Sequence, residues 1–418
     1  MIVLLTKKNE KLVPKILFFS ILIMLIPFII CYTLFDIKDM LMPLVSIAYI
    51  IQIFILTNTF INRDTKIRGS SLWIALALLL LQYFTIFINS IRNIDINSND
   101  YINAISIPLN FLLFFEIMFN VKVYKKQIRY FMEYITIFSL VACIYNILFN
   151  WIEIVNLRYI TSSYDVDLRS FFTNRNQFAA FLFISLVANC YICSEKKVTV
   201  RHICIFILQI FNLVLTMSRG GILACSIFLF ILFLQNVRKF KVFITTTSIC
   251  LITICIIVTN NEFMNFINNN IFRINKGTTG RTDIWRMGIN IAMNNNIISG
   301  VGFYTGLQIA KPMGFRYSQF HSLFVDAIVG GGFIELMFLV CIMFYITRRC
   351  LKLCMDTKYK KIYRASIIAM WILGVFESVS FFSIGYVDTL YTIFFITIPL
   401  LLSNLSIDEC VVSDYKMS

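Results

Sequence analysis

Charged residues are scarce in this 418-residue chain, where Asp, Glu, Lys and Arg together make up only 14%. A soluble domain carries about 25% charged residues, so this chain lacks the polar side chains needed to cover a water-exposed surface. Its hydrophobic residues, 59% of the total, fall in long blocks. Each block is close to the length of about 20 residues that a helix needs to cross a bilayer. Because backbone polar groups in lipid must be paired within the segment, we expect an all-α, polytopic integral membrane protein.

About twelve apolar segments are long enough to be transmembrane helices. They cover residues 12–34, 42–61, 71–91, 103–121, 130–152, 177–193, 203–217, 220–235, 242–259, 321–346, 365–383 and 386–403. We expect one membrane domain, 1–418, in which the first five helices (12–152) form a scaffold. The remaining parts are an outer loop (153–176), helices six to nine (177–259), a large outer loop (260–320), helices ten to twelve (321–403) and a cytoplasmic tail (404–418).

Basic residues recur in every second loop between these segments. The N-terminus carries Lys7, Lys8 and Lys11, and the loop after the second segment carries Arg63 and Lys66. The positive-inside rule therefore predicts cytoplasmic N- and C-termini and an extracytoplasmic location for residues 260–320. The net charge of +15 mostly reflects this topology. Nucleic-acid binding is the weaker interpretation because the basic residues are scattered over many short loops instead of being gathered on one face.

Cysteine is absent from the expected outer loops, so no extracellular disulfide is expected. Two cysteine pairs, Cys190 with Cys193 and Cys350 with Cys354, have partly metal-like spacing but no histidine nearby. Buried, unliganded cysteines are the better interpretation. The outer loops also contain no cluster of carboxylates and no His/Cys set of the kind that binds Mg²⁺ or Zn²⁺. We therefore expect neither a metal nor a cofactor.

Histidine is nearly absent, and one of the two in the chain, His321, begins the expected tenth span. Before it, apolar residues from Ile284 to Met293 recur at helical spacing, which predicts an amphipathic helix lying on the outer leaflet with Trp285 at the interface. Glycines 330–332 are expected to let another helix approach closely. The run from Gly300 to Gly302 is expected to form a turn whose N–H groups could face an anion. A purely structural, hydrogen-bonded His321 is the alternative.

Arginines stand at unusual places on the same expected outer side. Arg175 begins helix six, where a cation opposes the helix dipole and calls for an anionic partner, and Thr173, Asn174 or Asn176 is expected to cap that helix. Arg219 lies in the turn between two short spans, where snorkelling is the alternative to function. With Arg281 and His321, and with Asp283 and Tyr304 nearby in sequence, these residues predict a phosphate site. One group in it can move protons near neutral pH.

Four motifs in order resemble the O-antigen ligase / O-antigen polymerase superfamily. They are Arg219 to Leu223 (R-x3-L), His321 to Gly332 (H-x10-G), Gly280-Arg281-x3-Trp285 followed by Ser299 to Gly302, and Asn174-Arg175-Asn176 ahead of a span. The resemblance covers about residues 170–335. One departure is Ser322, because members of the family usually have Asn after the histidine.

The resemblance implies a GT-C-like bundle with one large extracytoplasmic loop. It also implies metal-independent, inverting glycosyl transfer at the outer face of the plasma membrane. The donor would be an undecaprenyl-pyrophosphate-linked glycan held by Arg219 and Arg281, with His321 as general base. We expect Arg175, Asn176, Asp283, Trp285 and Tyr304 to line the substrate site.

The expected reaction is polymerisation of repeat units into a surface polysaccharide. Ligase-type transfer of a finished glycan to a lipid or wall acceptor, a flippase or transporter, and a scaffold in a polysaccharide-export complex are the alternatives. A transporter would show internal repeats and charges along a midplane path. The informative charges here are expected at one face. The expected partners are the lipid-linked glycan, the bilayer and other polysaccharide-assembly proteins, with no nucleic acid.

Overall fold

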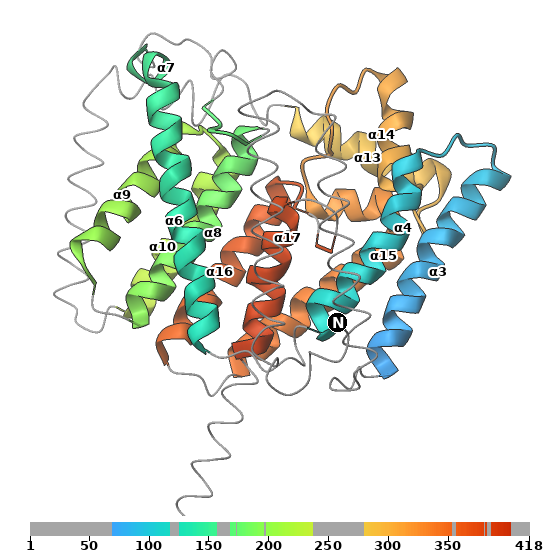
Figure 1. Cartoon of the computed structure of the whole chain (residues 1–418). Coiled ribbons are helices and arrows are strands. Elements are labelled where there is room, and N and C mark those ends of the chain that lie inside the picture. Colours follow the sequence, from blue (N-terminus) through green and yellow to red (C-terminus); the bar gives the residue numbers. More distant parts are fainter. Residues whose placement is uncertain are drawn as a thin grey trace, which may run out of the picture. The chain divides into compact units, whose positions relative to one another are not determined.

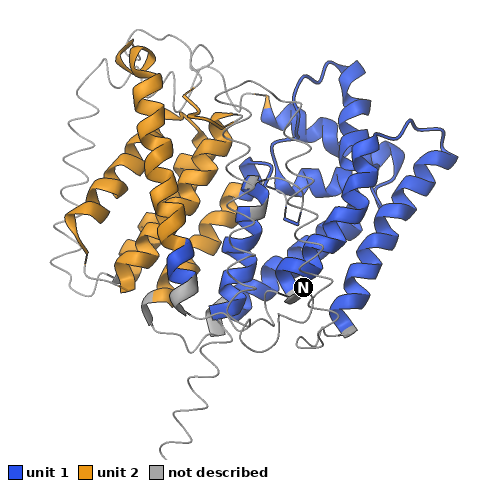
Figure 2. Ribbon diagram, viewed as in Figure 1, with its two compact units in different colours: residues 1–131, 281–356, 374–418 blue, residues 132–280, 357–373 orange. Residues whose placement is uncertain are grey.

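The computed structural model of the protein describes residues 69–117, 125–156, 168–172, 174–195, 198–236, 280–352, 357–379, 381–382 and 386–402. All regular secondary structure in these ranges is helical (Figure 1). The chain divides into two compact units (Figure 2). Unit 1 comprises residues 1–131, 281–356 and 374–418, and unit 2 comprises residues 132–280 and 357–373. Each unit is described by itself below.

Unit 1 contains most of the residues that surround His321. Its helices are α3 (Gly69–Ile91), α4 (Ser98–Phe111) with the π-helix η5 (Leu112–Ile117), α13 (Arg281–Asn295), α14 (Phe303–Ala310), η9 (Lys311–Met313), α15 (Leu323–Lys352), α17 (Tyr386–Thr392) and η10 (Ile393–Thr397). Helix α3 packs along α4, while α13 and α14 both pack on α15. The apolar residues of α13, α14 and the first part of α15 share one core, which includes Ile284, Leu307 and Val325.

Unit 2 is built around α8 (Arg175–Glu195), whose middle is almost entirely enclosed by protein. Helices α9 (Val200–Leu215) and α10 (Arg219–Asn236) both pack on α8. Most of α6 (Lys125–Phe149) and of α16 (Thr357–Phe376), together with the short α7 (Trp151–Asn156), complete the unit. The expected turn between the two short spans is confirmed, because α9 ends at Leu215 and α10 begins at Arg219.

Four described helices are long and apolar enough to cross a membrane. They are Ser70–Ile91, Ile128–Phe149, Arg175–Glu195 and Leu323–Arg349, and shorter apolar helices cover Val200–Leu215, Arg219–Gln235 and Leu390–Leu402. These helices identify an integral membrane protein, while the count of about twelve spans stays a prediction. The expected spans 12–34, 42–61 and 242–259 lie outside the described residues, as do residues 260–279 of the large loop and the tail 404–418.

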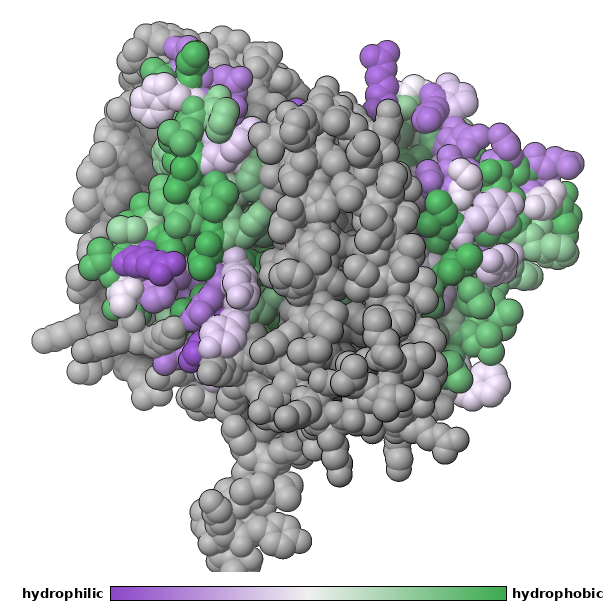
Figure 3. All heavy atoms as spheres, in the orientation of Figure 1, coloured by the Kyte–Doolittle hydropathy of each residue, from purple (hydrophilic) through white to green (hydrophobic). Residues whose placement is uncertain are grey.

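Exposed apolar stripes run along helices in both units. On α3 the stripe consists of Leu76, Leu80, Phe84, Phe87 and Ile91. On α6 it consists of Tyr134, Ile137, Val141, Ile144 and Leu148. Steps of three and four residues place each set on one helix face, and Figure 3 shows hydrophobic side chains over both helices. Stripes of this kind suit contact with lipid.

The three consecutive glycines of α15 interrupt the helix. Gly331 (φ −119°, ψ 16°) and Gly332 (φ 67°, ψ −157°) are non-helical, so α15 consists of a short half, residues 323–330, and a long half, residues 333–352. The expectation that these glycines admit another helix is therefore wrong. The main chain of residues 297–302 approaches them instead. A Cβ on Gly332 would collide with the carbonyl of Ile298, which explains why glycine is needed there.

Candidate active site

Arg281, the first residue of α13, is bound by the last residue of α16 and by the residue that follows it. Its Nη1 donates to the carbonyl of Phe376 at 2.6 Å, and its Nη2 lies 2.8 Å from Glu377 Oε1. The side chains of Arg281 and Glu377 are only 15% and 5% exposed. A buried ion pair is costly to desolvate unless both partners are well paired. This geometry therefore fixes a positive charge at a defined, largely dry position.

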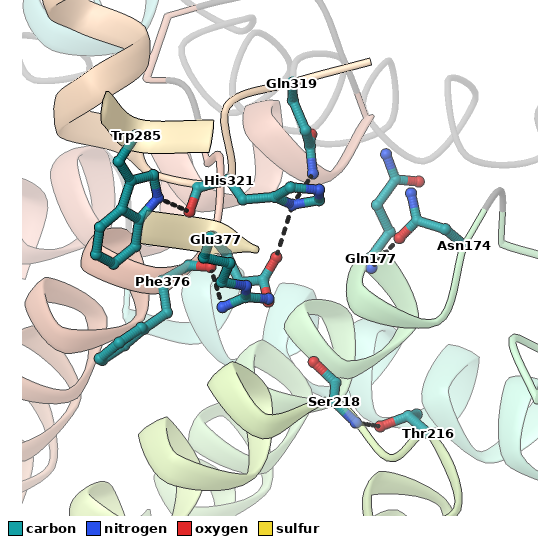
Figure 4. Close-up of polar contacts among 10 residues, drawn as sticks. Asn174, Gln177, Thr216, Ser218, Trp285, Gln319, His321, Phe376 and Glu377 are labelled. Atoms are coloured by element: carbon teal, nitrogen blue, oxygen red, sulfur yellow. Dashed lines mark hydrogen bonds and ion pairs between the residues drawn. The ribbon is translucent and has the colours of Figure 1, made fainter. Parts of the chain in front are cut away.

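His321 stands beside this ion pair, immediately before α15. Its Nδ1 lies 3.2 Å from the side-chain amide nitrogen of Gln319 and 4.0 Å from Glu377 Oε2 (Figure 4). Its carbonyl accepts a hydrogen bond from Trp285 Nε1 at 3.3 Å. The ring of Tyr317 contacts the imidazole edge to face, with centroids 5.6 Å apart. The histidine is thus held from α13, from its own loop and from the end of α16.

The backbone of His321 adopts a left-handed conformation, with φ of 56°. Such a conformation is rare for a residue with a Cβ, and strained residues of this kind gather at functional sites. Met217, two residues before Arg219, has φ of 51°, and Ser170, shortly before Arg175, has φ of 55°. Of these three residues only His321 lies inside one of the motifs, and its strained backbone is consistent with a functional role.

Burial lowers the pKa of His321 to about 4, and the positive charge of Arg281 acts in the same direction. At neutral pH the imidazole is therefore uncharged and able to accept a proton, which a general base requires. Glu377 faces the same ring and would stabilise the imidazolium once it forms. Arg281 supplies fixed positive charge for an anion. Together the three side chains can bind an anionic group and remove a proton beside it.

Glu377 is the residue that sequence reasoning did not place in the site. Its carbonyl accepts from the backbone N–H of Leu323 at 3.2 Å, so it also fixes the beginning of α15. The available signal was a carboxylate near the end of an apolar segment, where ionisable residues usually serve a site. Its partner Arg281 is 96 positions away in the sequence, so no local pattern could have identified the pair.

Trp285 belongs to the site in a different way than expected. The helix predicted from Arg281 is confirmed as α13, but its apolar face packs on protein. Gly288 on this face lies so close to α15 that a Cβ there would meet Val325 at 2.8 Å. The expectation of a helix resting on the outer leaflet with Trp285 as its interfacial anchor is therefore corrected. The Trp285 side chain bonds to His321, as described above, and lies beside the ring of Phe376.

Two further predicted site residues of unit 1 contact other groups. Asp283 and Arg286 are both largely exposed and form a surface pair at 3.6 Å. Tyr304 lies in the first turn of α14, where its N–H donates to Asp100 and its ring packs on Phe303. Burial, followed by the charges of Asp388 and Asp100, raises the pKa of Tyr304. The substrate-binding roles of Asp283 and Tyr304 stay predictions.

The N–H groups of the Gly300–Gly302 turn do not face an anion site, contrary to the expectation from sequence. The N–H of Val301 donates to the carbonyl of Val329, and the N–H of Gly302 donates to the carbonyl of Gly330. Both donors are therefore used inside the protein. Within the described residues, no group of three or more His, Cys, Asp or Glu side chains is arranged to hold a metal ion.

Arg175, Asn176 and Arg219 belong to unit 2. Asn174 caps α8 by accepting from the N–H of Gln177 at 2.9 Å (Figure 4), which confirms the expected cap. Arg175 and Arg219 are the first residues of α8 and α10. These helices meet close to their beginnings, because a Cβ on Gly221 would lie 2.7 Å from the Cβ of Ala179. Their association with His321 stays a prediction.

The described helices belong to a membrane protein, and its His321 cluster brings together a histidine, an arginine and a carboxylate. In a comparison with protein families, residues 204–340 match the model of a family described as O-antigen ligase. The match confirms, for these residues, the resemblance inferred from the motifs. Arg219, Arg281 and His321 all lie inside the matched stretch. No curated protein matches the chain.

Proposed function

We propose that this protein is a glycosyltransferase that joins undecaprenyl-pyrophosphate-linked repeat units into a surface polysaccharide at the outer face of the plasma membrane. The observation that carries the proposal is the largely enclosed imidazole of His321, 18% exposed, beside the Arg281–Glu377 pair. It lies within residues that match a family described as O-antigen ligase. A proton acceptor and a fixed cation are the two groups that metal-independent transfer from a pyrophosphate donor requires.

In the proposed reaction, an acceptor sugar hydroxyl attacks the anomeric carbon of the donor glycan with inversion. The bond from that carbon to the pyrophosphate oxygen breaks, and its electron pair leaves with the undecaprenyl pyrophosphate. The hydroxyl proton passes to the ring nitrogen of His321 that carries no proton in the neutral imidazole, and Glu377 lies beside the imidazolium that forms. Arg281 stabilises the charge that grows on the leaving pyrophosphate. Arg219, at the beginning of α10, is proposed to bind the same group.

Ligase-type transfer of a finished glycan to a lipid or wall acceptor is the second candidate. It is favoured by the match to a family described as O-antigen ligase. Both reactions need the same donor and the same proton acceptor, so the His321 cluster supports them equally. They differ in the acceptor, and the products that accumulate when the protein is missing distinguish them.

Deletion of the gene tests the proposal and separates the alternatives. A polymerase deletion should leave surface glycans of one repeat unit. Loss of a ligase should leave full-length polymer on the lipid carrier, and loss of a flippase should leave single lipid-linked units on the cytoplasmic leaflet. Electrophoresis of surface and lipid-linked glycans reads out all three outcomes, and only the first agrees with polymerisation.

Complementation of the deletion strain tests the role of His321. His321→Ala should give no polymer at a normal amount of membrane protein. The matched control is His202→Ala, because His202 is the other histidine and contacts Thr199 at the beginning of α9. This control should restore full-length polymer. Polymer of normal length in the His321→Ala strain would refute the assignment.

A further inference from the structure

The break in α15 is closed by hydrogen bonds to the chain between α13 and α14, here called the docked segment (residues 297–302). In an unbroken helix the carbonyls of residues 329 and 330 would accept from the N–H groups of residues 333 and 334. All four groups bind the docked segment instead. The bonds are Val301 N to Val329 O (2.8 Å), Gly302 N to Gly330 O (2.9 Å), Phe333 N to Ile297 O (2.8 Å) and Ile334 N to Ile298 O (3.2 Å).

Two side chains of α3 hold the docked segment from another side. Thr85 Oγ1 donates to the carbonyl of Ser299 at 2.6 Å, and Asn89 Nδ2 donates to the carbonyl of Val301 at 2.7 Å. Both bonds are buried. Irregular backbone within a membrane bundle is tolerated only when its polar groups are paired within the protein. These two side chains therefore complete the pairing of carbonyls that α15 does not reach.

Asp100 of α4 fixes the end of the docked segment. Its carboxylate accepts from the N–H groups of Tyr304 and Thr305 and from the Thr305 hydroxyl, at 3.0, 2.8 and 2.7 Å. It therefore caps α14 from outside, where Gly302 occupies the cap position with φ of 86° and has no side chain to do so. A Cβ on Gly302 would lie 2.6 Å from Asp100 Oδ2, so the close contact requires glycine.

The docked segment connects the two reactive residues of unit 1. Helix α13 begins with Arg281 and ends at Asn295, so that a single residue separates it from the segment. The short half of α15 follows His321 and reaches the break at Gly331. Because this half-helix is not continuous with the long half, its last carbonyls depend on the segment for their partners. Movement of the segment would therefore displace α13, which begins with Arg281, and the short half of α15, which follows His321.

We propose that Thr85, Asn89 and Asp100 are positioning residues for the transfer reaction, which they support by anchoring the docked segment that orients His321 and Arg281. The inference rests on the function proposed above. Thr85 and Asn89 contact the docked segment directly. Asp100 binds the first turn of α14, which directly follows the segment. A displacement of about 1 Å in a reacting group can lower the rate about a hundredfold, so anchoring of this kind matters for turnover.

Thr85→Val tests the proposal because it keeps the shape of the side chain and removes the donor. Purified protein is supplied with lipid-linked glycan extracted from cells that lack this protein. We expect kcat to fall about tenfold or more, with the KM for the glycan unchanged. Thr85→Ser restores the hydroxyl and should restore kcat. Ser90→Ala is the matched control, since Ser90 lies on the same helix and its hydroxyl bonds only within α3, to Ile86 at 3.1 Å.

Hydrogen exchange of the Val301, Gly302, Phe333 and Ile334 amides provides a readout that does not depend on catalysis. Thr85→Val should accelerate their exchange, and Ser90→Ala and Thr85→Ser should not. An unchanged kcat in Thr85→Val, or a lowered kcat with unchanged exchange at these amides, would overturn the positioning role. If the wild-type protein does not turn over the glycan, the proposed function fails, and the exchange data still decide whether Thr85 anchors the segment.

Discussion

At the scale of single residues, the proposed site consists of a base (His321), a cation (Arg281) and a carboxylate (Glu377). The carboxylate contacts both of the others. Sequence reasoning identified His321 because histidine is so rare in this chain, and Arg281 because it begins a helical pattern. It could not identify Glu377, whose role depends on tertiary contacts with both. Removing one partner of a buried pair leaves an unpaired charge, which costs about 3–5 kcal/mol. Glu377 therefore supports both stability and the orientation of Arg281.

The pH dependence of turnover follows from the pKa of His321. The base must be uncharged, and its lowered pKa of about 4 keeps it so down to that pH. We therefore expect a constant rate from neutral pH downwards, with an acid limb near pH 4 instead of near the ordinary value of about 6.5. Among the residues that the structure describes, Arg281, Glu377 and Tyr317 are the titratable or charged groups with a recorded interaction with the ring.

Initial rates of the purified protein over this pH range, with His202→Ala as control, check the expectation. The control should give the same profile, because its substitution leaves the His321 surroundings intact. A limb centred near pH 6.5 in both proteins would show that the base is solvated, contrary to the burial described here.

At the scale of elements, apolar block length predicted most of the described helices to within several residues. Helices α3, α8, α9 and α10 correspond to the expected spans 71–91, 177–193, 203–217 and 220–235. The break in α15, the short α14 and the docking of residues 297–302 were not predicted. Hydropathy reports only whether a segment can be buried. The break depends on backbone bonds between segments about 30 residues apart in the sequence, which a local pattern does not record.

Gly332→Ala tests the importance of the break. The conformation of Gly332, φ 67° and ψ −157°, is essentially restricted to glycine, and a Cβ would also collide with the Ile298 carbonyl. Backbone strain alone costs about 1–3 kcal/mol. We expect Gly332→Ala to lower the free energy of unfolding by more than this, because the docked segment must also be displaced. Thermal unfolding in detergent measures the effect.

Gly314→Ala is the matched control for this substitution. Gly314 also has a positive φ, 86°, but no atom lies within 4 Å of the position of its Cβ. This variant should have the backbone strain without the collision, so its free energy of unfolding should fall by less than that of Gly332→Ala. Equal losses in the two variants would mean that the docked segment adds nothing to stability.

At the scale of the whole molecule, the protein is a helical membrane protein whose proposed chemistry is confined to one group of residues. The exposed stripes on α3 and α6 explain the low charge content from which the membrane assignment began. The family match extends from Cys204 to Val340 and so includes motifs from both units. Sequence order alone could not establish which arginines serve His321. The family resemblance supplied the roles of Arg219 and Arg281, and the structure supplied the surroundings of Arg281.

The most direct test of the central claim is turnover by the purified protein reconstituted in liposomes with extracted undecaprenyl-pyrophosphate-linked glycan. The account predicts that the wild-type protein lengthens the glycan and releases undecaprenyl pyrophosphate in equal amounts, in the presence of EDTA. It predicts that His321→Ala binds the glycan but does neither. Turnover by His321→Ala at the wild-type rate, or wild-type turnover that EDTA abolishes and Mg²⁺ restores, would contradict it.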